Sequence, residues 1–316
     1  MTDCIPDVSV VLTTYNRGHL LPRTLDCILG QTLGDFELII SDDCSTDKTR
    51  EICQTYARND SRVRYYRNDT NLNMPGNLNA GVRRARGAYI ANLHDGDFYR
   101  SDLLEKWRSA LERHPSAALV FNYYEVLDAD GQPTGLFHKE YDCELIPGKT
   151  LILDILRKTS SPVWGTVMVR AEAYREEGLF DERFRFISDV DMWMRLAARH
   201  DVACVMEPLI GLIPRESDHC MAPMKWPATL WNEDLLCTNI ERIFGPADGI
   251  NGHIWRQFFR TWDRKVVRWL AGDIYHRRWE SVRDSADFFS ESLSPRLAPL
   301  RRAFQAIRRL TALRAG

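Results

Sequence analysis

Short, mostly apolar runs mark three positions in the first hundred residues, and each run has the length of one β-strand. They are Val8–Leu12, Phe36–Ile40 and Tyr89–Leu93, with one polar residue in each. Nearly continuous apolar runs of this length are typical of strands that are covered on both faces. Between them, apolar residues recur at three- and four-residue spacing, which predicts helices. Helices are expected at Leu20–Leu29, Thr46–Asn59 and Leu78–Ala85, and one further strand at Val63–Tyr66.

Strands that alternate with helices of this length indicate an α/β protein, with a mostly parallel sheet flanked by helices. In such sheets ligands bind outside the carboxyl ends of the strands. The polar loops that follow the strands are therefore the places to look for chemistry. They are Thr13–Arg17, Ser41–Asp47 and His94–Tyr99.

The rest of the chain is less regular. Its predicted elements are strands at Ala117–Val126 and Val163–Val169, a turn at Asp128–Thr134, and helices at Thr150–Lys158 and Ser188–Leu196. From about Trp226 the pattern is helical throughout. We therefore expect an α/β domain over residues 1–225, with halves at about 1–100 and 101–225, and a helical extension over 226–316.

Two carboxylates, Asp95 and Asp97, follow the strand at Tyr89–Leu93 and flank Gly96. A hard cation such as Mg²⁺ or Mn²⁺ takes one or two protein carboxylates and completes its shell with water and phosphate oxygens. Glycine between the acids lets the backbone turn sharply. A surface turn is the alternative, because Asp-Gly is a common turn dipeptide.

Two other loops carry acids next to predicted helices. Asp47 resembles a helix cap, whereas Asp42 and Asp43 precede the cap and are candidates for contacts with a ribose or a base. Asp189 and Asp191 begin the helix predicted from Ser188. A carboxylate there suits a general base, and ordinary chemistry of a helix N-terminus is the alternative.

Taken together, the ordered motifs resemble glycosyltransferase family 2 over roughly residues 7–218. The segments that carry this resemblance are Val8–Arg17, Gln31–Thr32, Phe36–Asp47, Asn79–Gly81, Ala85–Ile90, His94–Asp97, Phe180–Glu182 and Asp189–Leu196. The resemblance implies a GT-A fold and an inverting, metal-dependent transfer of a sugar from a nucleotide-sugar, with a UDP-sugar favoured, to an acceptor hydroxyl.

The resemblance also implies roles for individual residues. Asp97 and Asp95 would hold Mn²⁺ or Mg²⁺ and the diphosphate, and Asp189 or Asp191 would be the catalytic base. Three further candidates come from side-chain chemistry alone. His219 would assist the metal or the diphosphate, or be an ordinary surface or packed histidine. Arg215 would pair with phosphate or with a surface acid, and Trp164 would form an acceptor platform or pack in the core. The expected nucleotide-binding residues are Thr13, Thr14, Tyr15, Arg17, Asp42, Asp43, Asn79 and Asp95.

The sequence departs from the family's pattern at three places. Ser188 replaces the Glu of a Glu-Asp pair, so the base could be Asp191 instead of Asp189. His94 replaces a common Asp before the metal motif, which leaves open whether Asp95 or Asp97 binds the metal directly. Cys44 stands where Gly or Asn is more usual, and we interpret it as a small packed residue.

The distribution of charge adds one feature that the motifs do not explain. The net charge is −2, yet residues 251–316 hold 14 Lys and Arg against 6 Asp and Glu. Within that region, Arg296–Arg314 has six arginines, no acid, and apolar residues at helical spacing. This pattern predicts a basic amphipathic helix that lies on an anionic membrane, or one that packs on the catalytic domain.

Composition bears on the class of protein and on its location. The 44% apolar and 27% charged content is typical of a soluble globular chain, and eight cysteines without a Cys-x-x-Cys pair favour reduced thiols. We expect a cytoplasmic enzyme, with peripheral contact at the inner membrane face left open. Its partners would be a nucleotide-sugar and a glycan or lipid-linked acceptor of cell-surface assembly, and no nucleic acid. The alternatives are an inactive nucleotide-sugar-binding module and a nucleotidyltransferase.

Overall fold

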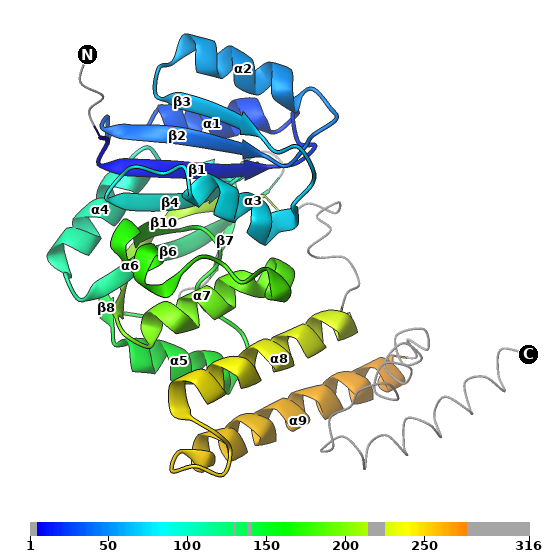
Figure 1. The fold of residues 1–316 in the computed structure, drawn as a ribbon. Coiled ribbons are helices and arrows are strands. Elements are labelled where there is room, and N and C mark those ends of the chain that lie inside the picture. The colour runs from blue at the N-terminus through cyan, green and yellow to red at the C-terminus, as the bar shows by residue number, and fades with distance from the viewer. Residues whose placement is uncertain (1–4, 129–130, 138–140, 214–224, 277–316) are drawn as a thin grey trace, which may run out of the picture. The chain divides into compact units, whose positions relative to one another are not determined.

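The computed structural model describes residues 5–128, 131–137, 141–213 and 225–276 (Figure 1). Its described strands belong to a single sheet. The strands are β1 (Val8–Thr14), β2 (Phe36–Asp42), β3 (Val63–Arg67), β4 (Tyr89–His94), β5 (Phe98–Tyr99), β6 (Ala117–Leu127), β7 (Pro133–Phe137), β8 (Leu145–Ile146), β9 (Val167–Arg170) and β10 (Asp201–Leu212).

The helices alternate with the strands through the first half of the chain, as the apolar pattern predicts. They are α1 (Leu21–Leu29), α2 (Thr49–Asn59), α3 (Asn73–Val82), α4 (Leu103–Arg113), α5 (Gly148–Lys158), α6 (Ala171–Glu177), the 3-10 helix η1 (Glu182–Ile187), α7 (Ser188–Ala197), α8 (Lys225–Phe244) and α9 (Gly252–Tyr275). The α/β class expected from the sequence is confirmed.

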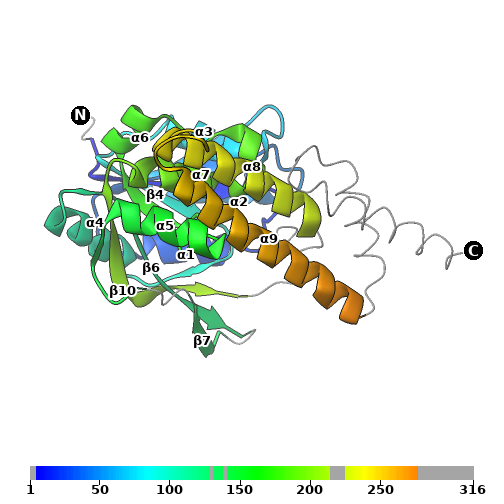
Figure 2. The same ribbon diagram turned by 90° about the horizontal axis from the view of Figure 1, so that it is seen from below.

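The sheet has the order β3-β2-β1-β4-β9-β6-β10-β5, with β7 added beside β6 and β8 beside β10. Strands β3, β2, β1 and β4 are parallel, and so are β6 and β10. Strand β9 runs antiparallel between β4 and β6 and joins the two parallel groups. Figure 2 shows β7 projecting from the side of β6. The turn predicted at Asp128–Thr134 therefore leads directly into a hairpin strand at Pro133.

Helices cover both faces of the sheet, which explains why every residue of β1 is buried. On one face, Leu25 of α1 and Trp107 of α4 join a core with Val10 of β1. On the other face, α3 lies against β1, and a side chain at Gly81 would overlap Val11. In Figure 1, α3 and α7 lie in front of the strands and α1 lies behind them.

Contacts divide the chain into two compact units. The first comprises Met1–Ile155 and Ser160–Glu216, and the second comprises Leu156–Thr159 and Ser217–Gly316. The domain boundary expected at residue 225 stays a prediction. In the second unit, the rings of Trp255 and Phe259 stack along α9 at 5.7 Å. Among the helices that the structure describes, none combines the length and the apolar character that crossing a membrane requires.

Candidate active site

The carboxyl ends of β1, β2 and β4 meet at one edge of the sheet. In the register of the ladders, Thr13 of β1 lies opposite Ser41 of β2 and opposite His94 of β4. Parallel pairing brings these strand ends together because all three strands run in the same direction. The three polar loops that the sequence singles out are therefore neighbours.

The loops after β1 and β2 are tied to each other. The Asn16 backbone N–H donates to Ser45 Oγ at 2.9 Å, and Thr46 N–H donates to Asn16 Oδ1 at 2.7 Å. Asn16 and Cys44 both adopt left-handed backbone, with φ of 50° and 66°. This conformation is easiest for Gly or Asn, which explains why Cys44 is unusual at its position. Its thiol donates to a backbone carbonyl, at Asp69 O.

The predicted nucleotide-binding residues of these loops differ in accessibility. Thr13 and Thr14 are buried, and the Tyr15 ring is 47% exposed. Asp42 is fully buried and accepts hydrogen bonds from Tyr65 Oη at 2.6 Å and Ser45 N–H at 2.9 Å. The Asp42 carboxyl therefore organises the loop, and its contact with a nucleotide stays a prediction.

Asp43 and Asn79 also serve the protein itself. Asp43 Oδ1 accepts hydrogen bonds from Leu72 N–H at 2.8 Å and from Asn68 Nδ2 at 3.2 Å. The Asn79 amide both donates to Phe180 O and accepts from Phe180 N–H, each at 2.9 Å. Asn79 thus fastens α3 to the segment before α7. This contact gives no geometric support to the predicted role of Asn79 in nucleotide binding.

The loop after β4, which we call the metal loop (His94–Asp97), is held by α1 and by the loop after β1. Arg17 Nη1 forms an ion pair with Asp95 Oδ1 at 3.0 Å. Arg23 Nη2 donates to Gly96 O at 2.8 Å, and Gly96 N–H donates to Thr24 Oγ1 at 2.8 Å. Gly96 has φ of 87°, which favours glycine between the two acids. The predicted sharp turn is confirmed.

The donor set of the metal loop fits a divalent ion only if phosphate and water supply most of the ligands. Among the described residues, no three His, Cys, Asp or Glu side chains gather around one metal position. Asp95 is already engaged with Arg17, and Asp97 is half-buried at the end of the loop. One or two carboxylates per ion is the usual arrangement for Mg²⁺ bound to phosphate. Of the two carboxylates, that of Asp97 is the more exposed, and its contact with a metal stays a prediction.

Asp189, at the start of α7, faces the metal loop across Gly165. A Cβ at Gly165 would lie 2.8 Å from His94 Nε2 and 3.8 Å from Asp189 Oδ2. Burial of the Tyr124 hydroxyl, followed by the charges of Asp97 and Asp189, raises the pKa of that group. Both carboxylates therefore lie near the same tyrosine, and the structure brings together the expected metal ligand and the expected base.

Burial raises the pKa of Asp189 to about 7, although its carboxylate accepts a hydrogen bond from Val190 N–H at 2.8 Å. A carboxylate with this pKa is suited to take up a proton near neutral pH. The adjacent Ser188 is fully buried, and its Oγ has no hydrogen-bond partner in the described part of the chain.

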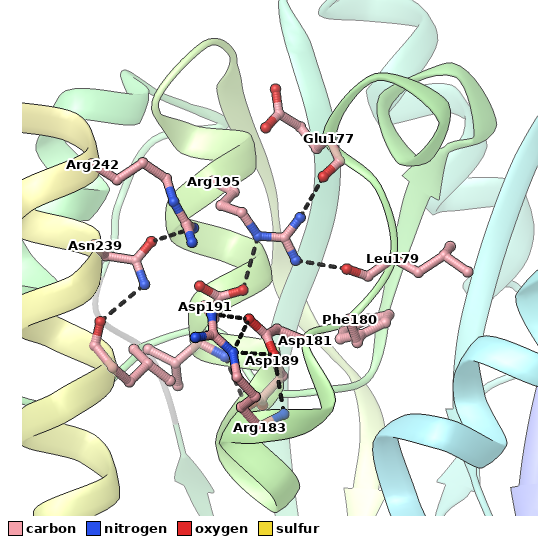
Figure 3. Close-up of polar contacts among 12 residues, drawn as sticks. Glu177, Leu179, Phe180, Asp181, Arg183, Asp189, Asp191, Arg195, Asn239 and Arg242 are labelled. Atoms are coloured by element: carbon pink, nitrogen blue, oxygen red, sulfur yellow. Dashed lines mark hydrogen bonds and ion pairs between the residues drawn. The ribbon is translucent and has the colours of Figure 1, made fainter.

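Figure 3 shows Asp191 together with Asp189, and the environments of the two carboxylates differ. Asp191 is fully buried and forms an ion pair with Arg195 Nε at 2.8 Å. The same guanidinium donates to Glu177 O at 2.6 Å and to Leu179 O at 2.8 Å. Arg195 therefore joins α7 to the end of α6 and the segment after it, with Asp191 as its counter-charge, and this structural contact favours Asp189 as the base.

The remaining predicted residues fall in two groups. Trp164 is 36% exposed, and its ring lies 5.5 Å from the ring of Tyr124, which places it beside the site. His219 and Arg215 lie outside the described residues. The sequence analysis did not identify Tyr124, Gly165 or Arg23, because each acts through a partner more than forty residues away.

A solved structure shares this arrangement of strands and helices. TarS from S. aureus in complex with UDP-GlcNAc has a TM-score of 0.68, covering 96% of this chain and 89% of that chain, at 16% identity. The GT-A fold expected from the sequence is thus confirmed. Residues 9–178 match the family model described as glycosyl transferase family 2, and this chain belongs to that family.

Sequence relatives agree with this assignment. EpsE of Bacillus subtilis, which carries the name of a glycosyltransferase, is 32% identical over 199 residues, covering 60% of this chain and 66% of EpsE. TuaG of the same organism, named for teichuronic acid biosynthesis, is 35% identical over 137 residues, covering 43% of this chain and 54% of TuaG. The chain thus matches just under two thirds of EpsE and about half of TuaG.

Proposed function

We propose that this protein transfers a sugar from a UDP-sugar to an acceptor hydroxyl with inversion, in the assembly of a cell-surface polysaccharide or glycolipid. The observation that carries the proposal is that the Asp189 carboxylate lies beside the loop that holds Asp97: Asp189 Oδ2 is 3.8 Å, and His94 Nε2 2.8 Å, from the position of a Cβ at Gly165. One acid lies on the loop that follows β4, and the other begins the acceptor-side helix. The UDP-GlcNAc bound in TarS and the name of TuaG support the donor and the pathway.

Asp189 is the general base in this proposal. Its carboxylate accepts the proton of the acceptor hydroxyl while the acceptor oxygen forms a bond to the anomeric carbon. The bond from that carbon to the diphosphate oxygen breaks on the opposite side, so the configuration inverts. A positioned base of this kind contributes about 10²–10⁴-fold to the rate.

The metal loop serves the leaving group. A divalent cation, when bound, neutralises the charge that develops on the diphosphate as it departs. Asp97 would be its protein ligand. Asp95 and Arg17 hold the loop in shape through their ion pair, while the bonds from Arg23 and Thr24 fix Gly96. These bonds preorganise the loop for the donor, and preorganised groups are what electrostatic stabilisation of a transition state requires.

The decisive experiment measures UDP release and product formation from a panel of UDP-, GDP- and dTDP-sugars with Mn²⁺ or Mg²⁺. Proton NMR of the product then reports the anomeric configuration. We expect turnover with a UDP-sugar, its loss in Asp97→Ala, and inversion at the anomeric carbon. A control without divalent cation, in EDTA, tests the metal requirement separately.

Each alternative function gives a different result in the same experiment. Tight binding of a nucleotide-sugar without turnover by any donor would favour the inactive binding module. Incorporation of a nucleotide with release of pyrophosphate would favour a nucleotidyltransferase. Wild-type rates in Asp97→Ala would overturn the proposed role of the metal loop.

We also propose where the protein works. A lipid-linked acceptor would place it at the inner face of the cytoplasmic membrane, and the basic segment Arg296–Arg314 would supply the attraction to anionic lipid. This segment lies outside the described residues, so the proposal depends on its sequence alone.

A further inference from the structure

The imidazole of His94, in the metal loop, lies close to the proposed base. Its Nε2 lies 2.8 Å, and its Cε1 3.5 Å, from the position of a Cβ at Gly165, so the ring rests against the glycine backbone. Asp189 Oδ2 is 3.8 Å from that same position. The imidazole and the catalytic carboxylate are therefore close enough for one hexose ring to touch both.

The backbone of His94 is held firmly. The hydroxyl of Tyr99, a buried side chain, accepts a hydrogen bond from His94 N–H at 2.9 Å and donates one to His94 O at 2.7 Å. The imidazole itself has no hydrogen bond with any residue in the part of the chain that the structure describes. A neutral imidazole offers one donor nitrogen and one acceptor nitrogen.

The location of this ring indicates which part of the donor it would contact. The diphosphate end of the donor lies at Asp97, and the acceptor hydroxyl lies at Asp189, so the transferred sugar must occupy the space between them. The proposed function is assumed in this step. We propose that His94 is a specificity-determining residue that forms a hydrogen bond with a hydroxyl group of the transferred sugar, and that Gly165 leaves the room for it.

The chemistry of position 94 supports a contact with a neutral hydroxyl. A carboxylate at this position would only accept hydrogen bonds, whereas a neutral imidazole can both donate and accept. A hydroxyl likewise does both. A site built to pair with a sugar hydroxyl discriminates strongly against a donor that lacks it, because the buried partner is then left without a hydrogen bond.

The test compares the affinity for a nucleotide-sugar with the affinity for its nucleotide. Calorimetry would measure the affinities for UDP-GlcNAc, UDP-glucose, UDP-galactose and UDP, all with Mn²⁺. The nucleotide-sugars that bind more tightly than UDP are then used to test the variants. We expect His94→Phe to weaken those sugars about tenfold while UDP affinity changes less than twofold. His94→Gln, whose amide reaches the position of the imidazole Nε2, should recover most of the loss.

Two further variants make the result specific. Gly165→Ala should reproduce the loss, because its methyl group displaces the ring of His94. His114→Phe is the matched control: it removes a histidine just before β6, at the opposite edge of the sheet, and should change neither affinity. Unchanged UDP affinity in each variant also shows that the variant is folded.

The outcomes separate this inference from the proposed function. Equal losses for UDP and the UDP-sugars in His94→Phe would assign His94 to the diphosphate or the metal and overturn the inference alone. No loss for any sugar would also overturn it. If the wild-type protein bound neither UDP nor any UDP-sugar, the proposed function would fail and the inference with it.

Discussion

At the scale of single residues, the environment of Asp189 determines how the reaction should depend on pH. Burial raises the pKa of this carboxyl to about 7, and a general base must be unprotonated. We expect kcat/KM to fall about tenfold for each pH unit below 7 and to level off above it. Steady-state rates between pH 5 and 9 would test this. A profile that is flat down to pH 5 would contradict the assignment.

The same pKa makes a prediction about stability. Because the folded pKa of Asp189 lies above the unfolded value near 3.9, the native state holds the proton more tightly. The stability that this tighter proton binding by Asp189 contributes is therefore lost as pH rises from about 4 to about 7. Asp189→Asn stays neutral, so it should melt about 2–4 °C higher than the wild type at pH 8. The difference should shrink at pH 5, and activity should be lost at both values.

At the scale of elements, the ion pair between Asp191 and Arg195 fixes the start of α7. Breaking a buried pair at one partner costs about 3–5 kcal/mol, because the remaining charge loses its partner. Arg195→Met should therefore lower the free energy of unfolding by this amount in urea titrations. The double variant Asp191→Asn with Arg195→Met should recover part of the loss. A single variant as stable as the wild type would mean that the pair is not a structural tie.

Most elements of the first half could be predicted from the sequence, because strands such as Val8–Thr14 are buried on both faces and are therefore rich in apolar residues without a regular alternation. The long strand β10 was missed. It contains Pro208 and Gly211, and its pairing with β6 is interrupted by register shifts, so no regular apolar period marks it. Strands β5 and β8 have two residues each, which is too short for any pattern.

The candidate site was predictable to the same degree. Acids at strand ends and helix starts stand out locally, so the metal loop and Asp189 could be named as candidates from the sequence. The partners that give each acid its character were not, since Arg17 lies 78 residues from Asp95 in the sequence. The choice between Asp189 and Asp191 also required the structure, because only burial and the contact with Arg195 distinguish two acids one residue apart.

At the scale of the whole molecule, the excess of positive charge in residues 251–316 predicts attraction to anionic surfaces. We expect the full chain to sediment with phosphatidylglycerol vesicles at low salt and to be released as salt increases. Deletion of residues 296–316 should reduce this binding, and Arg308→Ser with Arg309→Ser should reduce it in part. Unchanged binding after the deletion would support a helix that packs on the protein instead.

The position of β9 has a consequence for how the chain is made. Strand β4 ends at His94, but its neighbour β9 begins only at Val167, and it also completes the pairing of β6. Until residue 170 leaves the ribosome, β4 keeps one open edge, and open edges recruit strands from other chains. A truncated polypeptide that stops near residue 100 should therefore self-associate during synthesis. The strands β3, β2, β1 and β4 thus depend for their solubility on β9, which is translated much later.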